Sequence, residues 1–270
     1  MPRIITLITD FGLADEYVGV MKGVILARAP EAKIVDISHG IRRQNILQAA
    51  LLLKSAYGFF PKGTVHLIVV DPGVGSDRRL ILLQADGHLF LSPDNGVLSL
   101  VLEAECFETA FEVKCEQFYL SPVSSSFHGR DILAPVAAQV AAGLEPAEVG
   151  PVIMSHSLHK LKIAQAVIDT RQGKIAGEVV AVDYFGNLQT NIGENCLKDI
   201  QTAENLTVKV TIKNKTIIGI KSAYAQKAHG CLLAIIGSRG FLEIAVNQGS
   251  AASFLNVGVG DSVEIEMTKA

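Results

Sequence analysis

The sequence has few cysteines, and nothing in their arrangement indicates metal binding. The four cysteines form no Cys-x-x-Cys pair and have no histidine nearby at the spacing of a metal site. This argues against a cysteine-based metal centre and against a disulfide-stapled secreted scaffold. We therefore expect reduced, mostly buried thiols, as in a cytoplasmic protein. The cysteines are Cys106, Cys115, Cys196 and Cys231.

Long apolar stretches and an excess of one charge are also lacking. No apolar run approaches the ~20 residues that span a bilayer. Residues 1–3 lead into a strand pattern without the apolar segment of a signal peptide. The net charge of −3 comes from mixed acidic and basic residues, without a basic run. These absences predict a cytoplasmic location, no membrane association and no nucleic-acid partner.

The first half of the chain alternates apolar runs with helical patterns. Strand-like runs cover residues 4–9, 33–38 and 65–70, and apolar positions recur at helical spacing within residues 15–30 and 46–57. This order predicts right-handed crossovers and a mainly parallel sheet with helices on both faces. The continuous apolar runs also predict strands that are buried on both sides.

The same α/β domain continues through a hairpin and two further helices. The hairpin is expected over residues 80–92 and a short helix over residues 97–103. A polar loop, residues 124–131, carries an acid at the start of a helix over residues 132–142. We expect this α/β domain to cover residues 1–160.

The pattern changes in the rest of the chain. Residues 177–183, 206–212, 216–220 and 263–267 are strand-like, and no long helical pattern follows them. We expect a smaller, all-β, barrel-like domain over residues 161–270.

Polar residues follow the predicted parallel strands where each strand ends. Asp10, His39 and Asp71 stand at these positions, and ligands of open parallel sheets bind beyond the carboxyl ends of the strands. Acids converging without a metal-ligand pattern favour a polyhydroxylated ligand such as a ribose, with Asp10 as the candidate. Asp71 is followed by Pro72, two glycines and then Arg78, so a short turn can bring carboxylate and guanidinium together. The alternatives are a helix-capping role for Asp10 and a structural Asp71–Arg78 pair.

Several familiar motifs fail on inspection. Gly73-Val74-Gly75 has Arg78 where a dinucleotide fingerprint needs its third glycine, and Asp10-Phe11-Gly12 lacks the other kinase motifs. There is no Gly-x-Ser-x-Gly elbow, no His-Glu-x-x-His and no Walker lysine. Phosphate transfer and metal-dependent hydrolysis are therefore disfavoured, and we expect no metal. His128, in a polar loop, is either an acid–base or positioning group or a surface residue.

Five motifs in order resemble the S-adenosyl-L-methionine hydroxide adenosyltransferases, the hydrolytic relatives of the fluorinating and chlorinating enzymes. They span nearly the whole chain. The motifs are residues 8–12 (Ile-Thr-Asp-Phe-Gly), 70–75 with Arg78-Arg79, 127–131 (Phe-His-Gly-Arg-Asp), 183–187 (Asp-Tyr-Phe-Gly-Asn) with 190–192, and 237–240 (Gly-Ser-Arg-Gly).

The resemblance implies hydrolysis of S-adenosyl-L-methionine to adenosine and L-methionine without a cofactor. It implies an N-terminal α/β domain and a C-terminal β-barrel. It also implies a homotrimer, in which the substrate lies between the N-terminal domain of one subunit and the C-terminal domain of the next.

Specific roles also follow from the resemblance. The water-activating residues are Asp71, Arg78 and His128, and either Asp71 or His128 takes the proton. The substrate-binding residues are Asp71, Asp10 (ribose), Asn187 (adenine), Val246 (adenine, through its backbone), and Asp183, Ser238 and Glu243 (methionine). Arg239 either binds the methionine carboxylate or pins its turn, and Phe185 either stacks on adenine or belongs to the core.

Three alternatives to this hydrolase function remain open on the sequence. A halogenase would act on the same substrate, but the halogenating relatives carry tyrosine in place of Asp71 and lack the arginine–histidine pair. A sensor would bind adenosine or S-adenosyl-L-methionine without turning it over. A structural Asp71–Arg78 pair would leave the protein without this chemistry.

Overall fold

The computed structural model describes residues 4–102, 107–200 and 206–269. The chain divides into two compact units, Met1–Lys162 and Ile163–Ala270. Cys106 and the last residue of the helix expected over residues 97–103 lie outside the described part. In that part, no helix has the length and apolar character needed to cross a membrane.

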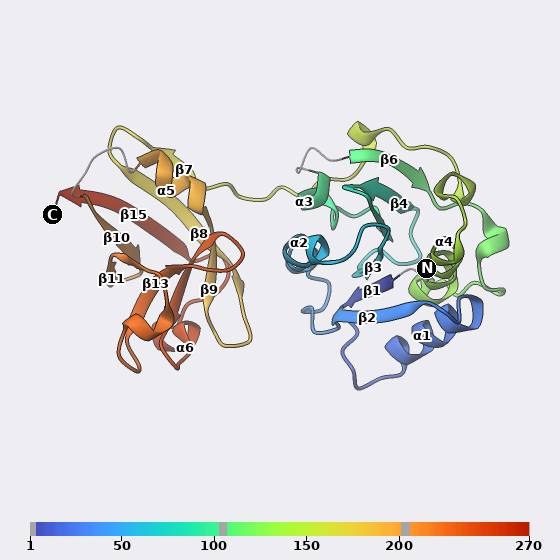
Figure 1. Ribbon diagram of the computed structural model, residues 1–270, viewed down its shortest axis with the longest axis horizontal. Coiled ribbons are helices and arrows are strands. Elements are labelled where there is room, and N and C mark those ends of the chain that lie inside the picture. Colours follow the sequence, from blue (N-terminus) through green and yellow to red (C-terminus); the bar gives the residue numbers. More distant parts are fainter. Residues whose placement is uncertain (1–3, 103–106, 201–205, 270) are drawn as a thin grey trace. The chain divides into compact units, whose positions relative to one another are not determined.

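The first unit is built on a six-stranded sheet in the order β2-β1-β3-β5-β4-β6 (Figure 1). The strands are β1 (Ile4–Thr9), β2 (Lys33–Ser38), β3 (Val65–Val69), β4 (Leu80–Ala85), β5 (His88–Pro93) and β6 (Phe107–Glu112). β2, β1, β3 and β5 run parallel, whereas β4 is antiparallel to both β5 and β6. The mainly parallel sheet is confirmed, as is the hairpin β4–β5.

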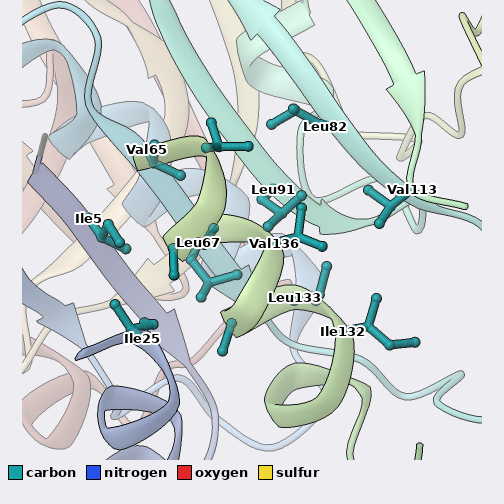
Figure 2. Packing of buried hydrophobic residues seen from close by; sticks show 14 of the residues in the cluster. Ile5, Ile25, Val65, Leu67, Leu82, Leu91, Val113, Ile132, Leu133 and Val136 are labelled. Carbon is teal, nitrogen blue, oxygen red and sulfur yellow. The ribbon is translucent and has the colours of Figure 1, made fainter. Parts of the chain in front are cut away.

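Helices cover both faces of this sheet. They are α1 (Tyr17–Arg28), α2 (Ile46–Ala56), α3 (Ser99–Leu102) and α4 (Ala134–Ala142), with 3₁₀ turns at Tyr57–Phe59, Glu116–Phe118, Pro146–Val149 and Ser155–Ser157. α1 and α4 bury Ile25 and Val136 against Ile5 and Leu67 of the sheet (Figure 2). α2 and α3 pack on the opposite face, where Ile8 points. Successive strand residues face opposite sides, so β1 contributes to both cores.

The helix ends follow the local signals in the sequence. The Asn45 side chain accepts a hydrogen bond from Gln48 N at 2.9 Å and so caps the start of α2. Gly143 closes α4 in the left-handed conformation, with φ +114°. α1 ends at Arg28, shortly before Pro30.

Three features of this unit differ from the expectation. β2 is an edge strand with exposed Lys33, Val35 and Asp36, so its apolar run does not indicate burial on both sides. β6 was not expected, and it extends the sheet by pairing with β4. The described cysteines are free, but none is buried, and Cys231 is exposed.

The helix after the polar loop also begins earlier than expected. A π-helical turn, Gly129–Leu133, precedes α4. Asp131 therefore lies inside the helix rather than at its start, and is 1% exposed. Its carboxylate accepts hydrogen bonds from Arg130 Nε at 2.6 Å and from Ser124 N at 2.8 Å, which stabilises the buried charge.

The second unit is a nine-stranded, nearly barrel-shaped sheet with the path β11-β10-β15-β8-β9-β14-β13-β12, and β7 pairs with β8. The strands are β7 (Val167–Asp169), β8 (Lys174–Val182), β9 (Leu188–Gly193), β10 (Leu206–Ile212), β11 (Lys215–Ile218), β12 (Ile220–Lys221), β13 (Leu232–Ile236), β14 (Phe241–Val246) and β15 (Ser262–Lys269). Val179, Leu242 and Val263 are among its buried core residues. The unit is not purely β, because it also contains α5 (Glu194–Ile200), α6 (Ala251–Leu255) and a 3₁₀ turn at Tyr224–Gln226.

Candidate active site

A cavity of about 640 Å³ opens in the first unit beyond the carboxyl ends of β1 and β3. Asp10 follows the last residue of β1, Asp71 follows β3 by two positions, and His128 immediately precedes the π-helical turn. All three line this cavity. The parallel strands thus place the two acids at one edge of the sheet.

Arg78 joins Asp71 to His128. Its Nε donates to Asp71 Oδ1 at 2.7 Å, and its Nη2 contacts Asp71 Oδ2. The same Nη2 lies 3.1 Å from His128 Nδ1. The Asp71 and Arg78 side chains are 7% and 11% exposed. Of the three residues that the resemblance implies to be water-activating, Arg78 therefore contacts both of the others.

The contact with Arg78 determines how His128 carries its proton. A guanidinium has donors only, so His128 Nδ1 must accept and the proton of the neutral ring sits on Nε2. Burial lowers the pKa of His128, and the positive charge of Arg78 lowers it further. The ring is thus held neutral with one free N–H donor.

A glycine permits the turn after Asp71 to approach the loop before His128. Gly75 has φ +81°, and a Cβ at this position would lie 2.6 Å from the carbonyl oxygen of Ser125. Only glycine fits both the conformation and the space. Gly75 therefore sets how closely the Arg78 turn and the His128 loop pack.

The same cavity has an aromatic wall. Phe11, Tyr17 and Phe127 contact one another with ring centroids 5.3–5.7 Å apart. The Arg130 guanidinium lies over the Phe127 ring at 5.0 Å. The Asp10 carboxylate borders this wall and accepts a hydrogen bond from Gln44 N at 2.7 Å. An apolar wall beside a carboxylate suits a ligand with both a flat ring and hydroxyl groups.

The second unit contains a pocket of its own, with a volume of about 710 Å³. All the site residues expected in this half of the chain line it, namely Asp183, Asn187, Ser238, Glu243 and Val246. Phe185 and Arg239 also line the pocket. Phe185 is 72% exposed, so it is not a core residue.

Asp183 orients the amide of Asn187. Asp183 Oδ1 accepts hydrogen bonds from Phe185 N at 2.9 Å and Asn187 N at 2.8 Å. Asp183 Oδ2 accepts from Asn187 Nδ2 at 3.0 Å. A carboxylate can only accept, so the amide nitrogen faces Asp183 and Asn187 Oδ1 remains an acceptor for a ligand.

Two further side-chain pairs shape this pocket. The Tyr224 hydroxyl donates to Glu243 Oε1 at 2.6 Å, and Arg239 Nη1 donates to Gln189 Oε1 at 2.7 Å. Burial raises the pKa of Glu243, and the nearby Asp183 carboxylate raises it further. Burial and the bond to Glu243 raise the pKa of Tyr224 to about 12. The pocket thus offers both a carboxylate and a guanidinium to a ligand.

Comparison with known proteins assigns the family. Residues 5–150 match the SAM hydroxide adenosyltransferase N-terminal domain, and residues 177–264 match the C-terminal domain of the same name. The chain belongs to the SAM hydroxide adenosyltransferase family.

The chain is similar both to proteins named as hydrolases and to proteins named as fluorinases. The (R)-S-adenosyl-L-methionine hydrolase of Salinispora tropica is 33% identical, over 97% of each chain. A fluorinase of Actinopolyspora mzabensis is 24% identical, over 97% of this chain and 96% of its own. The crystal structure of an uncharacterized conserved protein from Thermotoga maritima superposes with a TM-score of 0.89 at 38% identity, over 97% of this chain and 99% of that one.

Sequence reasoning on this family member missed Tyr17, Gln189 and Tyr224. None of them lies in the five motifs, and each reaches a pocket only because the fold pairs distant segments. Gln189 pairs with Glu243 in the register of β9 and β14. A correct prediction of this strand register would have placed Gln189 beside the expected site residue Glu243. Among the residues that the structure describes, no group of three histidine, cysteine or acidic side chains is placed to hold a metal ion.

Proposed function

We propose that the protein hydrolyses S-adenosyl-L-methionine to adenosine and L-methionine. The observation that carries the proposal is the contact of one guanidinium, that of Arg78, with both Asp71 and His128. A relative 33% identical over nearly the whole chain bears the name of this activity, which supports the proposal. The reaction needs no cofactor.

The proposed step is an in-line attack of water on C5′ of the ribose. The water oxygen forms a bond to C5′, and the C5′–S bond breaks with its electron pair left on sulfur. The proton of the water passes to the enzyme. Because the sulfonium leaves as a neutral thioether, no general acid is required. The barrier then depends on orienting and activating a weak nucleophile.

We assign different parts of this work to Asp71 and His128, and their contacts support the assignment. His128 Nδ1 is occupied by Arg78, so its Nε2–H can only donate and serves to orient the water. The Asp71 carboxylate keeps lone pairs beyond the two that Arg78 uses and accepts the proton. Arg78 holds both groups and stabilises the charge that develops on the water oxygen.

The remaining site residues bind the substrate. We assign the ribose hydroxyls to Asp10, and the adenine edge to Asn187 and the backbone of Val246. Ser238 and Glu243 take the methionine end, with Arg239 facing its carboxylate. We also assign Asp183 to the methionine end, and its carboxylate additionally orients the amide of Asn187.

We also propose the assembly and location that the resemblance implies. The protein would form a homotrimer in which neighbouring subunits share each substrate. It would work in the cytoplasm, consistent with the free thiols of the described cysteines.

The test is chromatography of the products after incubation with S-adenosyl-L-methionine, with and without chloride. We expect adenosine and methionine in equal amounts, independent of chloride. A chloride-dependent 5′-halo product would make the protein a halogenase. Unreacted substrate together with tightly bound adenosine would make it a sensor.

A further inference from the structure

The turn that carries Asp10 is fastened to the end of β2 through a buried histidine. His39 follows β2 and is 5% exposed. Its Nδ1 lies 2.9 Å from Thr9 Oγ1, and its carbonyl oxygen accepts a hydrogen bond from Gly12 N at 2.9 Å. Thr9 Oγ1 also accepts from Phe11 N at 3.3 Å. Two of the backbone amides that follow Asp10 therefore depend on this connection.

The other edge of the His39 ring faces Asp36 of β2, which in turn pairs with Lys22 of α1. Nε2 lies 3.1 Å from Asp36 Oδ1, and Asp36 Oδ2 lies 2.5 Å from Lys22 Nζ. Burial raises the pKa of Asp36, but its contacts with Lys22 and His39 outweigh burial and leave that pKa below the usual value. The ionised carboxylate requires a proton on Nε2. In the singly protonated ring, Nδ1 then accepts from the Thr9 hydroxyl, whose lone pairs remain for Phe11 N.

The same strand carries a second threonine–histidine pair that serves as an internal comparison. Thr6 Oγ1 lies 2.8 Å from His66 Nδ1, and both side chains are completely buried. His66 packs among Tyr57, His88 and Phe90 rather than beside the Asp10 turn. The two pairs are alike in chemistry and burial but differ in what they support.

We propose that His39 is a positioning residue for substrate binding, which acts through Thr9 to hold the turn of residues 10–12. The inference rests on the proposed function, because it assigns the turn to the nucleoside. Asp10 and Phe11 both line the cavity of the first unit, so a shift of this turn moves a carboxylate and part of the aromatic wall together. Removing the Thr9 hydroxyl leaves Phe11 N without its acceptor, and the turn must relax.

The test measures the Kd of adenosine, together with KM and kcat for S-adenosyl-L-methionine, in matched variants. Thr9→Val should weaken adenosine binding and raise KM by about tenfold, the effect of one lost hydrogen bond, with kcat nearly unchanged. Thr6→Val, an identical change on the same strand, should leave both constants at the wild-type values. His39→Ala should behave like Thr9→Val. His39→Asn should restore binding, because the asparagine Oδ1 replaces Nδ1 as the acceptor for Thr9.

Several results would overturn the inference. If Thr9→Val and Thr6→Val changed Kd and KM equally, both threonine–histidine pairs would only stabilise the fold, and His39 would not position the substrate. A fall in kcat at constant KM, or a His39→Asn variant as weak as His39→Ala, would contradict positioning of the nucleoside. If His39→Ala does not fold, the comparison of Thr9→Val with Thr6→Val still tests the inference, because valine has nearly the same shape as threonine. A wild-type protein that neither binds adenosine nor consumes S-adenosyl-L-methionine would overturn the proposed function, and this inference with it.

Discussion

Arg78 is the residue on which the proposed chemistry depends most, because it touches both other members of the trio. Replacing it with lysine keeps the charge but removes the planar fork that reaches Asp71 and His128 together. We expect Arg78→Lys to lower kcat by about 10²-fold while KM changes little, since the lost interaction acts on the water and not on the bound substrate. Steady-state kinetics with S-adenosyl-L-methionine would measure this.

The neighbouring arginine supplies the control. Arg79 pairs with Asp94, its Nε 3.0 Å from Asp94 Oδ2, and lines neither pocket. Arg79→Lys should change thermal stability but leave kcat near the wild-type value. If the two lysine variants lost kcat equally, Arg78 would have only a structural role.

The protonation of His128 predicts the acid limb of the pH–rate profile. Its pKa is lowered by burial and by Arg78, so the neutral form persists below the ordinary histidine value of about 6.5. We expect kcat to stay constant as the pH falls through 6.5 and to decline only at lower pH. A profile with its midpoint at or above 6.5 would contradict the assignment of a neutral donor.

At the scale of elements, the turn after β3 must pack tightly against the loop before α4. Gly75→Ala would force a Cβ against the Ser125 carbonyl and strain a left-handed residue. We expect a loss of kcat together with a stability cost of about 1 kcal/mol or more. Gly63, with φ +83° and nothing within 4 Å of its added Cβ, is the matched control. Gly63→Ala should lower the melting temperature but leave kcat unchanged, and a similar loss of kcat in both variants would refute the role of the close packing.

The buried histidines of β3 and β5 predict how stability depends on pH. Burial lowers the pKa of His66 to about 3, and it also lowers the pKa of His88. Above pH 6.5 the folded and unfolded forms are both neutral, so these residues impose no penalty. Below it the unfolded chain binds protons that the folded state does not. Stability should therefore fall, by up to about 1.4 kcal/mol per pH unit for each histidine.

Chemical denaturation between pH 7.5 and pH 4 would measure this loss. The pKa values of Asp36 and Asp131 are lowered, so these carboxylates stay ionised over most of this window, and comparison with a His66 variant separates the histidine contribution from that of the other acids. His66→Asn, which keeps an acceptor for Thr6, should show a shallower slope. An unchanged slope in this variant would exclude His66 as its cause.

Helices and strands with strong local sequence signals could be predicted from the sequence. Features that depend on contacts between distant segments could not. Continuous apolar runs identified β1 and β3, and Asn45 and Gly143 marked helix ends. The π-helical turn at Gly129 has no sequence signal of its own, and within it Asp131 accepts hydrogen bonds from Ser124 N and Arg130 Nη2. The burial predicted for β2 was wrong, because an apolar run does not distinguish an edge strand from a central strand, and β2 lies at the edge of the sheet.

At the scale of the whole molecule, the site residues expected from the family resemblance fall into two groups. Asp10, Asp71 and His128 line the cavity of the first unit, whereas Asn187 and Glu243 line the pocket of the second. The family resemblance predicted these residues, but not the contacts that hold them in place. The bond from Tyr224 to Glu243 depends on the strand register of the second unit, which a single sequence does not specify.

The proposed trimer predicts that two inactive variants can rescue each other. Asp71→Ala disables the first unit and Asn187→Ala the second. If each site takes its two parts from different subunits, refolding the variants together should restore part of the activity. Asp71→Ala mixed with Arg78→Ala should not recover, because both changes disable the same unit. A monomeric mass, or no recovery in the first mixture, would contradict the shared site.

Direct attack of water on C5′ can be tested by hydrolysis in ¹⁸O-labelled water. We expect the label on the 5′ oxygen of adenosine and unlabelled methionine. Asp71→Ala should lose this labelled product while still binding adenosine. Adenosine without ¹⁸O at the 5′ position, or a 5′-halo nucleoside in its place, would contradict the account.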